Sequence, residues 1–160
     1  IPGLFQTAEY SAAMLSFWIK FLGTPNDVED AVAIRMQRQQ VLYHGGKRFV
    51  VLLEEQALRT WFSTAETQAG QLGRLLEIMS LPNVSLGIIP LMTQRLAIGS
   101  AGFWIFDDGL VALETPTASI EVTQPQECQL YARMFEALKT AAVYGRHARS
   151  IVVRVLGELN

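Results

Sequence analysis

The sequence predicts an α/β fold, in which a mixed sheet with a βαβ core is extended by an antiparallel hairpin and covered by N-terminal and C-terminal helices. Two short apolar runs, 49–53 and 84–89, enclose a segment with helical periodicity. This order is typical of parallel strands joined by a right-handed crossover. The pair Asp108-Gly109 separates two further β-rich runs, as the turn of a hairpin does.

Both ends of the chain carry helical patterns. Apolar side chains recur every three or four residues between Thr7, which can cap a helix, and Gly23, which can end one. Thr24-Pro25 is typical of a helix start, so a second helix is predicted from there to about Tyr43. The last helix is predicted to turn five side chains toward the core: Ala148, Ile151, Val152, Val155 and Leu159.

Two further helices have start signals of their own. Ser63 is followed three residues later by Glu66, and Thr123 by Gln126, which is the spacing of a capping box. Helices are therefore predicted to begin at both positions. A short strand is expected over 119–122, just before the second of them.

Composition limits the classes of function. A chain of 160 residues, 50% of them hydrophobic, can bury a core of its own, and we expect residues 1–160 to form a single domain. With 13 Lys and Arg against 15 Asp and Glu, its net charge of -2 gives no general attraction to DNA. No run approaches the roughly 20 apolar residues of a membrane span, and no targeting segment is evident. We therefore expect no membrane partner and a cytoplasmic location.

Arginines stand on the second predicted helix where apolar side chains are expected. Arg35 and Gln39 continue the apolar stripe and Arg38 lies beside it, so a guanidinium there needs a carboxylate or carbonyl partner. The candidate partners are acids at the ends of predicted strands: Glu54, Glu55 and Glu114. The pattern fits a structural ion pair between helix and sheet, which we favour, or a pocket in which an arginine holds a carboxylate or phosphate.

Motifs for catalysis or metal binding are missing from the sequence. Adjacent residues on a strand point to opposite faces, so Glu54 and Glu55 are not expected to form a catalytic pair. His44 and His147 have no metal-ligand spacing, and no nucleophile, phosphate-loop or dinucleotide motif occurs. We expect no catalytic residue, metal or cofactor. The irregular stretch 91–100 is expected to serve as a lid or a partner surface.

Several sequence segments occur together in one order. They are IPGLFQTAEY at the start, RMQRQQVL from residue 35, LLEEQALR, QLGRLLE, VSLGIIP, the Glu114-Thr115 pair, and Y-x-x-x-F-x-x-L from Tyr131 to Leu138. This order resembles the uncharacterised domain that lies C-terminal to an XRE-type helix-turn-helix in many actinobacterial transcriptional regulators, including WhiJ-like proteins. The resemblance spans nearly the whole chain.

The resemblance implies a regulatory domain whose DNA-binding helix-turn-helix lies before residue 1. Such a domain binds a small-molecule effector or a small partner protein, contacts DNA only through the preceding half, and allows a homodimer. The candidates for binding a ligand or partner are Arg35, Arg38, Gln39, Glu54, Glu55, Arg59 and Glu114. The candidates for coupling to the DNA-binding half are Gln6, Thr7 and Tyr10. The family supplies no catalytic residues.

Two other classes of function stay open at this point. One is a small hydrolase or transferase without recognisable motifs, which convergent polar groups in a deep cleft would favour. The other is a passive dimerisation domain, which an interface between identical surfaces and no pocket would favour.

Overall fold

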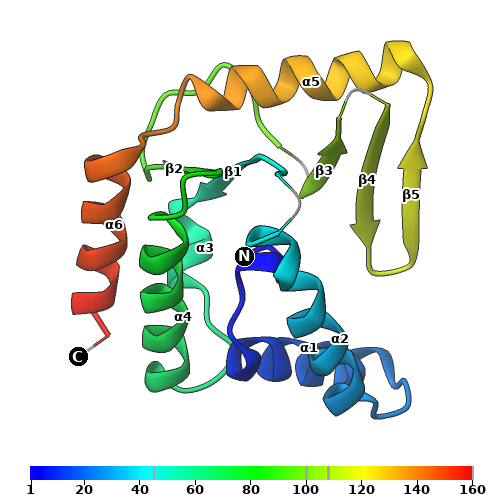
Figure 1. Cartoon of the computed structure of the whole chain (residues 1–160), viewed down its shortest axis with the longest axis vertical. Helices are drawn as coiled ribbons and strands as arrows, with labels where there is room; N and C mark the ends of the chain where they lie inside the picture. Colours follow the sequence, from blue (N-terminus) through cyan, green and yellow to red (C-terminus); the bar gives the residue numbers. More distant parts are fainter. Residues whose placement is uncertain (45, 100, 108, 160) are drawn as a thin grey trace. The chain divides into compact units, whose positions relative to one another are not determined.

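The computed structural model describes residues 1–44, 46–99, 101–107 and 109–159. Helices flank parallel and antiparallel strands, so the predicted α/β class is confirmed (Figure 1). The elements, with η for a 3-10 helix, are η1 (Gly3–Phe5), α1 (Ala8–Leu22), α2 (Val28–Arg38), η2 (Gln39–Leu42), β1 (Phe49–Glu54), α3 (Glu55–Arg59), α4 (Ala65–Ile78), β2 (Val84–Ile89), β3 (Phe103–Phe106), β4 (Leu110–Thr115), β5 (Ala118–Val122), α5 (Pro125–Lys139) and α6 (Gly145–Gly157). No helix within the described ranges is long and apolar enough to cross a membrane.

The chain divides into two compact units. Unit 1 comprises Ile1–Leu91 and Val143–Asn160, and unit 2 comprises Met92–Ala142. The chain leaves and re-enters unit 1 at neighbouring points, because Ile88 and Val143 form an antiparallel bridge with N···O distances of 2.9 and 2.8 Å. That residues 1–160 act as a single domain stays a prediction.

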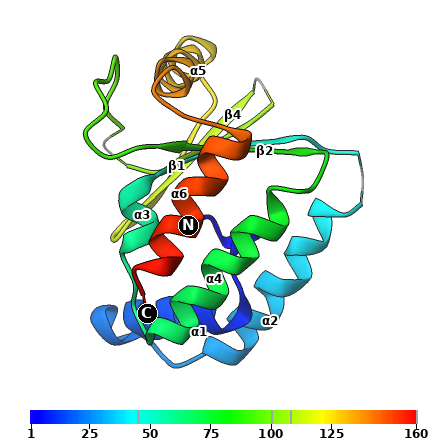
Figure 2. The ribbon, with the colours of Figure 1, turned by 90° about the vertical axis from the view of Figure 1, so that its left-hand side faces the viewer.

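Unit 1 is built on the predicted βαβ core. β1 and β2 run parallel, in a register that places Phe49 opposite Val84 and Glu54 opposite Ile89. Both strands are rich in aliphatic and β-branched residues, which suits buried parallel strands. α4 and α6 lie side by side and pack beneath the two strands (Figure 2).

The core of unit 1 joins the strands to α4 and α6. The buried side chains of α4 include Leu72, Leu75 and Ile78, and those of α6 are Ala148, Ile151, Val152 and Val155. Leu159, just beyond α6, is partly buried against the same core. The inward face predicted for the last helix is therefore confirmed.

The first two helices begin with different chemistry. The Thr7 hydroxyl accepts a hydrogen bond from the Tyr10 N–H (3.1 Å), and Gly23 ends α1 in the left-handed conformation, both as predicted. The predicted cap at Thr24 is wrong, because α2 begins at Val28. α2 then gives way to η2, within the range predicted for one continuous helix.

Two other predicted helix starts are also displaced. α4 is capped by Thr64, whose hydroxyl accepts from the Thr67 N–H (3.2 Å), one residue after the predicted cap at Ser63. α5 begins with Pro125 after Gln124 and has no side-chain cap, so the capping box predicted at Thr123 is wrong. Proline in the first turn supplies the helical φ without a hydroxyl cap.

Unit 2 is an antiparallel sheet with one helix. β3, β4 and β5 pair in that order, and the predicted hairpin and short strand are both present. α5 packs on β3 and β4 through contacts such as that of Phe103 with Tyr131, whose ring centroids are 5.1 Å apart. Within the described residues these strands form a sheet of their own, instead of extending the parallel pair into one mixed sheet as predicted. Asp108, in the predicted turn, and Ser100 lie outside the described residues.

Candidate functional site

A buried glutamine organises the first residues of unit 1. Gln6 is 2% exposed. Its Oε1 atom accepts hydrogen bonds from Ser11 Oγ (2.8 Å) and Arg35 Nη1 (2.7 Å), while its Nε2 atom donates to the Ile1 carbonyl (2.7 Å). One amide therefore links the chain start to α1 and α2.

Two more buried amides hold the backbone of the same segment. Gln39 belongs to η2 and Gln71 to α4, and both side chains are almost fully buried. Their bonds run from Gln39 Nε2 to the Gly3 and Gln6 carbonyls (2.9 and 2.7 Å), from Gln71 Nε2 to the Phe5 carbonyl (2.8 Å), and from the Thr7 N–H to Gln71 Oε1 (2.9 Å). We call Gln6, Arg35, Gln39 and Gln71 the N-terminal anchor. Because an unpaired buried polar group costs about 1–3 kcal/mol, these bonds fix residues 1–7 in place.

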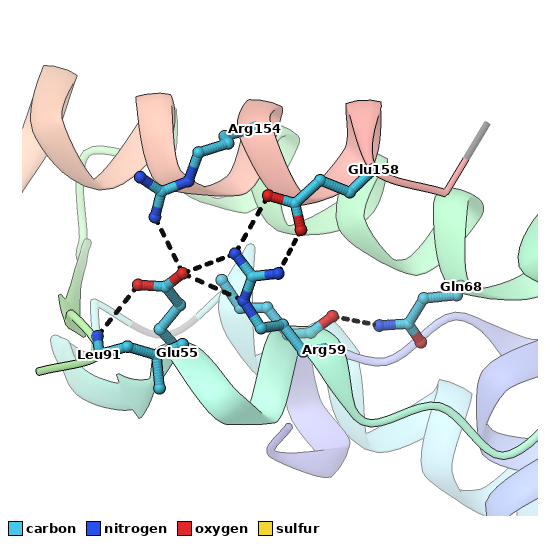
Figure 3. Close-up of polar contacts among 7 residues, drawn as sticks. Glu55, Arg59, Gln68, Leu91, Arg154 and Glu158 are labelled. Atoms are coloured by element: carbon cyan, nitrogen blue, oxygen red, sulfur yellow. Dashed lines mark hydrogen bonds and ion pairs between the residues drawn. The ribbon is translucent and has the colours of Figure 1, made fainter.

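The second polar group surrounds Glu55, the first residue of α3 (Figure 3). The carboxylate is 2% exposed. Its Oε1 atom accepts from Arg59 Nη2 and Nε (2.9 and 3.1 Å) and from Arg154 Nη2 (2.9 Å), and its Oε2 atom accepts from the Leu91 N–H (3.1 Å). Arg59 also pairs with Glu158. We call Glu55, Arg59, Arg154 and Glu158 the Glu55 cluster.

Local helical spacing assembles this cluster. Glu55 and Arg59 are four residues apart on α3, and Arg154 and Glu158 are four residues apart at the end of α6. Residues at this spacing share one face of a helix. The cluster therefore ties α3 to the C-terminal end of α6, and the Leu91 N–H ties both to the end of β2.

The charges of the cluster stabilise one another. Burial alone would raise the pKa of Glu55, but the hydrogen bonds from the Leu91 N–H, Arg59 and Arg154 outweigh burial, so its pKa is lowered. The hydrogen bonds that Arg59 donates, first to Glu158 and then to Glu55, raise the pKa of Arg59. Glu55 is therefore ionised at neutral pH and has little tendency to accept a proton.

Residues 1–154 match the model of a family described as a domain of unknown function, DUF5753. The chain belongs to this family. The match includes the N-terminal anchor and, from the Glu55 cluster, Glu55, Arg59 and Arg154. No curated protein and no solved structure matches the chain.

In this DUF5753 chain the predicted site residues fall into separate groups. Gln6, Arg35 and Gln39 belong to the N-terminal anchor, where Arg35 takes the amide oxygen of Gln6 as a partner, and the Thr7 N–H donates to Gln71 of the anchor. Glu55 and Arg59 meet in the Glu55 cluster. Four residues lie elsewhere: Arg38 is exposed at the end of α2, Glu54 is half-buried at the end of β1, Tyr10 is buried beside Phe62, and Glu114 is exposed on β4. Whether any of them binds a ligand or partner stays a prediction.

Sequence reasoning missed three residues of these groups. Arg154 and Glu158 were assigned no site role, although their four-residue spacing on a helix was visible in the sequence. Gln71 directly precedes Leu72 on the apolar face of α4, and its side chain is fully buried. A glutamine in such a stripe indicates a partner for backbone groups, because a buried amide needs hydrogen bonds.

Two small cavities lie within the units, one in each. One in unit 1, of about 170 Å³, is lined by residues that include Leu86, Tyr144 and Arg149. One in unit 2, of about 260 Å³, lies between β3, β4 and α5, and is lined by apolar side chains and Tyr131. Ligand pockets usually have about 300–1,000 Å³. Neither the anchor nor the Glu55 cluster lines these two cavities.

Proposed function

We propose that the chain is the C-terminal regulatory domain of an XRE-type helix-turn-helix transcriptional regulator. It binds a small partner protein or small-molecule effector and changes the arrangement of a DNA-binding domain that precedes residue 1. In this proposal the protein acts in the cytoplasm, is not an enzyme, and contacts DNA only through the preceding domain. The order of the sequence segments supports the proposal, and the N-terminal anchor is the structural observation that carries it.

The anchor supplies a mechanical route for coupling. Residues 1–7 would join the DNA-binding half to this domain, and they are held by side chains of α2, η2 and α4. Because the bonds involve both backbone and side-chain groups of the segment, a shift of any of these helices changes the position of the junction. An effector acts by this route only if it binds one arrangement more tightly than the other.

The proposal keeps both kinds of binding partner, a small protein and a small-molecule effector. Both described cavities fall below the usual range for drug-sized ligands. Glu55 itself is a poor general base at neutral pH, because hydrogen bonds from the Leu91 N–H, Arg59 and Arg154 lower its pKa.

The experiment compares two neighbouring glutamines in the full-length protein. Gln39 belongs to the anchor, whereas Gln40 is exposed and serves as the matched control. We expect Gln39→Ala to change affinity for operator DNA by at least about fivefold in a gel-shift titration, the lower end of usual coupling, and Gln40→Ala to leave it unchanged. Circular dichroism confirms that each variant is folded at the assay temperature.

Three results would overturn the proposal. The first is a coding sequence before Ile1 that holds no helix-turn-helix. The second is a full-length protein that does not bind its own promoter region. The third is equal DNA affinity of the Gln39 and Gln40 variants, which would limit the anchor to a structural role.

A further inference from the structure

The second half of α1 carries an exposed group of aromatic rings. Apolar residues follow helical spacing along the whole helix, but only the first half buries them, as Tyr10 shows. Phe17, Trp18 and Phe21 are 37–68% exposed. Phe62, in the segment between α3 and α4, is 40% exposed and joins them. We call these four residues the aromatic cluster.

The rings of the cluster form one continuous surface within unit 1. Phe17 has ring-centroid distances of 5.4 Å to Trp18, 6.1 Å to Phe21 and 5.5 Å to Phe62. Phe62 also packs edge-on against the buried ring of Tyr10, at 6.3 Å. This contact fixes the cluster to the buried part of α1. Figures 1 and 2 both show α1 at one end of unit 1.

The exposed area matches the lower size limit of a specific interface. At the ~150–250 Å² typical of an aromatic side chain, the four rings leave roughly 400 Å² exposed. Leu22 and Trp61, which adjoin the cluster in the sequence, are each 47% exposed. With them, two facing copies would bury roughly 1,000 Å², about the area at which a specific protein interface begins.

The charge of this surface indicates what covers it. Lys20 is the one charged residue between Ser16 and Leu22, so a strongly charged partner finds few countercharges there. Exposed aromatic rings can pack on the same rings of a second copy, because ring edges pack on ring faces. A second copy of the chain supplies the same surface at equal concentration and closes the contact by a two-fold axis.

We infer that two copies of the chain associate through the aromatic cluster, with the α1 helices packed across a two-fold axis. This inference stands independently of the proposed function. If the domain does regulate DNA binding, the dimer also fixes the spacing of the two N-terminal segments, since α1 begins directly after residues 1–7.

The test measures mass and association of the full chain by sedimentation equilibrium. We expect a dimer of twice the 17.8 kDa chain mass at tens of micromolar. Phe21→Glu should raise the dissociation constant at least about 100-fold, because it places a carboxylate in an apolar contact. Val153→Glu is the matched control, because Val153 is also an exposed apolar residue, at 54% against 68% for Phe21, but lies on α6, and it should leave the constant unchanged.

A second readout uses the tryptophans. Trp104→Phe leaves Trp18 and Trp61 as the only tryptophans of the chain, so emission then reports on the cluster and its neighbour. We expect a blue shift as concentration rises from about 0.1 to 100 µM, because association removes water from the rings, and no shift after Phe21→Glu. Phe21→Ser replaces Phe21→Glu if the charged variant does not fold.

The inference fails if the wild-type chain is monomeric throughout that concentration range. It also fails if Phe21→Glu and Phe21→Ser both retain the dimer, or if Val153→Glu abolishes it. Open-ended assembly, whose mass keeps growing with concentration, would contradict a closed two-fold contact at this surface.

Discussion

Glu55, the first residue of α3, combines burial with a negative charge. Its carboxylate is buried, yet it stays charged, because two guanidinium groups and one backbone N–H surround it. A buried ion pair adds little stability compared with apolar packing, but removal of one partner leaves the other charges uncompensated. The residue is therefore a sensitive point for stability.

We expect Glu55→Ala to lower the free energy of unfolding by about 1–3 kcal/mol, because Arg154 is 57% exposed and Arg59 keeps Glu158 as a partner. The variant leaves the Leu91 N–H without its carboxylate and brings Arg59 and Arg154 together without the shared anion. Glu77→Ala is the matched control, because Glu77 also pairs with an arginine but is 71% exposed, and exposed pairs contribute about 0–1 kcal/mol. Urea unfolding measures the free energy of unfolding of both variants. Equal losses would show that burial does not make Glu55 more important than an exposed glutamate.

The lowered pKa of Glu55 makes stability depend on pH. A carboxyl group whose pKa is lower in the folded state contributes stability above its unfolded pKa, here 4.5, and loses it as pH falls through the folded value. We therefore expect the free energy of unfolding to fall more steeply in the wild type than in Glu55→Gln as the pH falls below about 4.5. The lowered pKa of Glu158 acts in the same direction in both proteins. Parallel pH curves would show that Glu55 is not the responsible group.

The sequence indicated that Arg35 and Glu55 carry charge into the interior, but it also predicted this for Arg38, which is exposed, and it did not show how the groups pair. Arg35 was expected to need a carboxylate or carbonyl partner, and the structure gives it the amide oxygen of Gln6. Glu55 instead faces Arg59 and Arg154. Such pairs join residues up to 99 positions apart, and helical spacing predicts only neighbours within one element.

At the scale of the elements, β2 packs closely against Tyr144, the residue that precedes α6. A Cβ atom at Gly87 of β2 would lie 2.6 and 2.7 Å from two ring atoms of Tyr144 and 2.9 Å from Leu52 Cδ2. The aromatic ring that precedes α6 thus requires glycine on the strand. β2, the Tyr144 ring and the start of α6 therefore pack tightly together.

We expect Gly87→Ala to lower the free energy of unfolding by about 1–3 kcal/mol, because the added methyl group overpacks this contact. Gly70→Ala makes the same chemical change in α4, where nothing lies within 4 Å of the new Cβ. It should raise stability by up to about 1 kcal/mol through higher helix propensity. Thermal unfolding of both variants checks the opposite signs, and two changes of the same sign would contradict this reading of the contact.

Periodicity predicted the long elements well and their ends less well. α1, α4, α6 and both parallel strands follow patterns that extend over several turns or a whole strand. α3 was not predicted, because its five residues are too few for a periodic signal. Helix starts were displaced where several capping residues stand together, as at Ser63 and Thr64, since sequence alone does not choose between adjacent hydroxyls.

At the scale of the whole molecule, the bridge between Ile88 and Val143 gives unit 2 the character of an insertion. We expect a chain in which a short Gly/Ser linker replaces residues 93–141 to fold cooperatively, because the strands, α3, α4 and α6 keep their contacts within unit 1. Circular dichroism and urea unfolding measure this. A matched deletion of 84–91, which removes β2, should prevent folding.

A shortened chain that fails to fold would show that unit 1 depends on unit 2.

The α/β class was predictable from strand and helix order, whereas the separation into two sheets was not. Hairpin signals specify which strands pair with each other, and they do not state whether the pair joins a sheet formed elsewhere.

The two polar groups fasten the ends of the chain by different chemistry. The amides of the N-terminal anchor have no ionisable proton, so acid leaves Gln6, Gln39 and Gln71 unchanged. The Glu55 cluster holds the C-terminal end of α6 by charges, and its outer members, Arg154 and Glu158, are 57% and 47% exposed, where salt screens them. Acid or high salt should therefore loosen the last turn of α6 first, while residues 1–7 keep their place, and hydrogen exchange of the two termini would record this order.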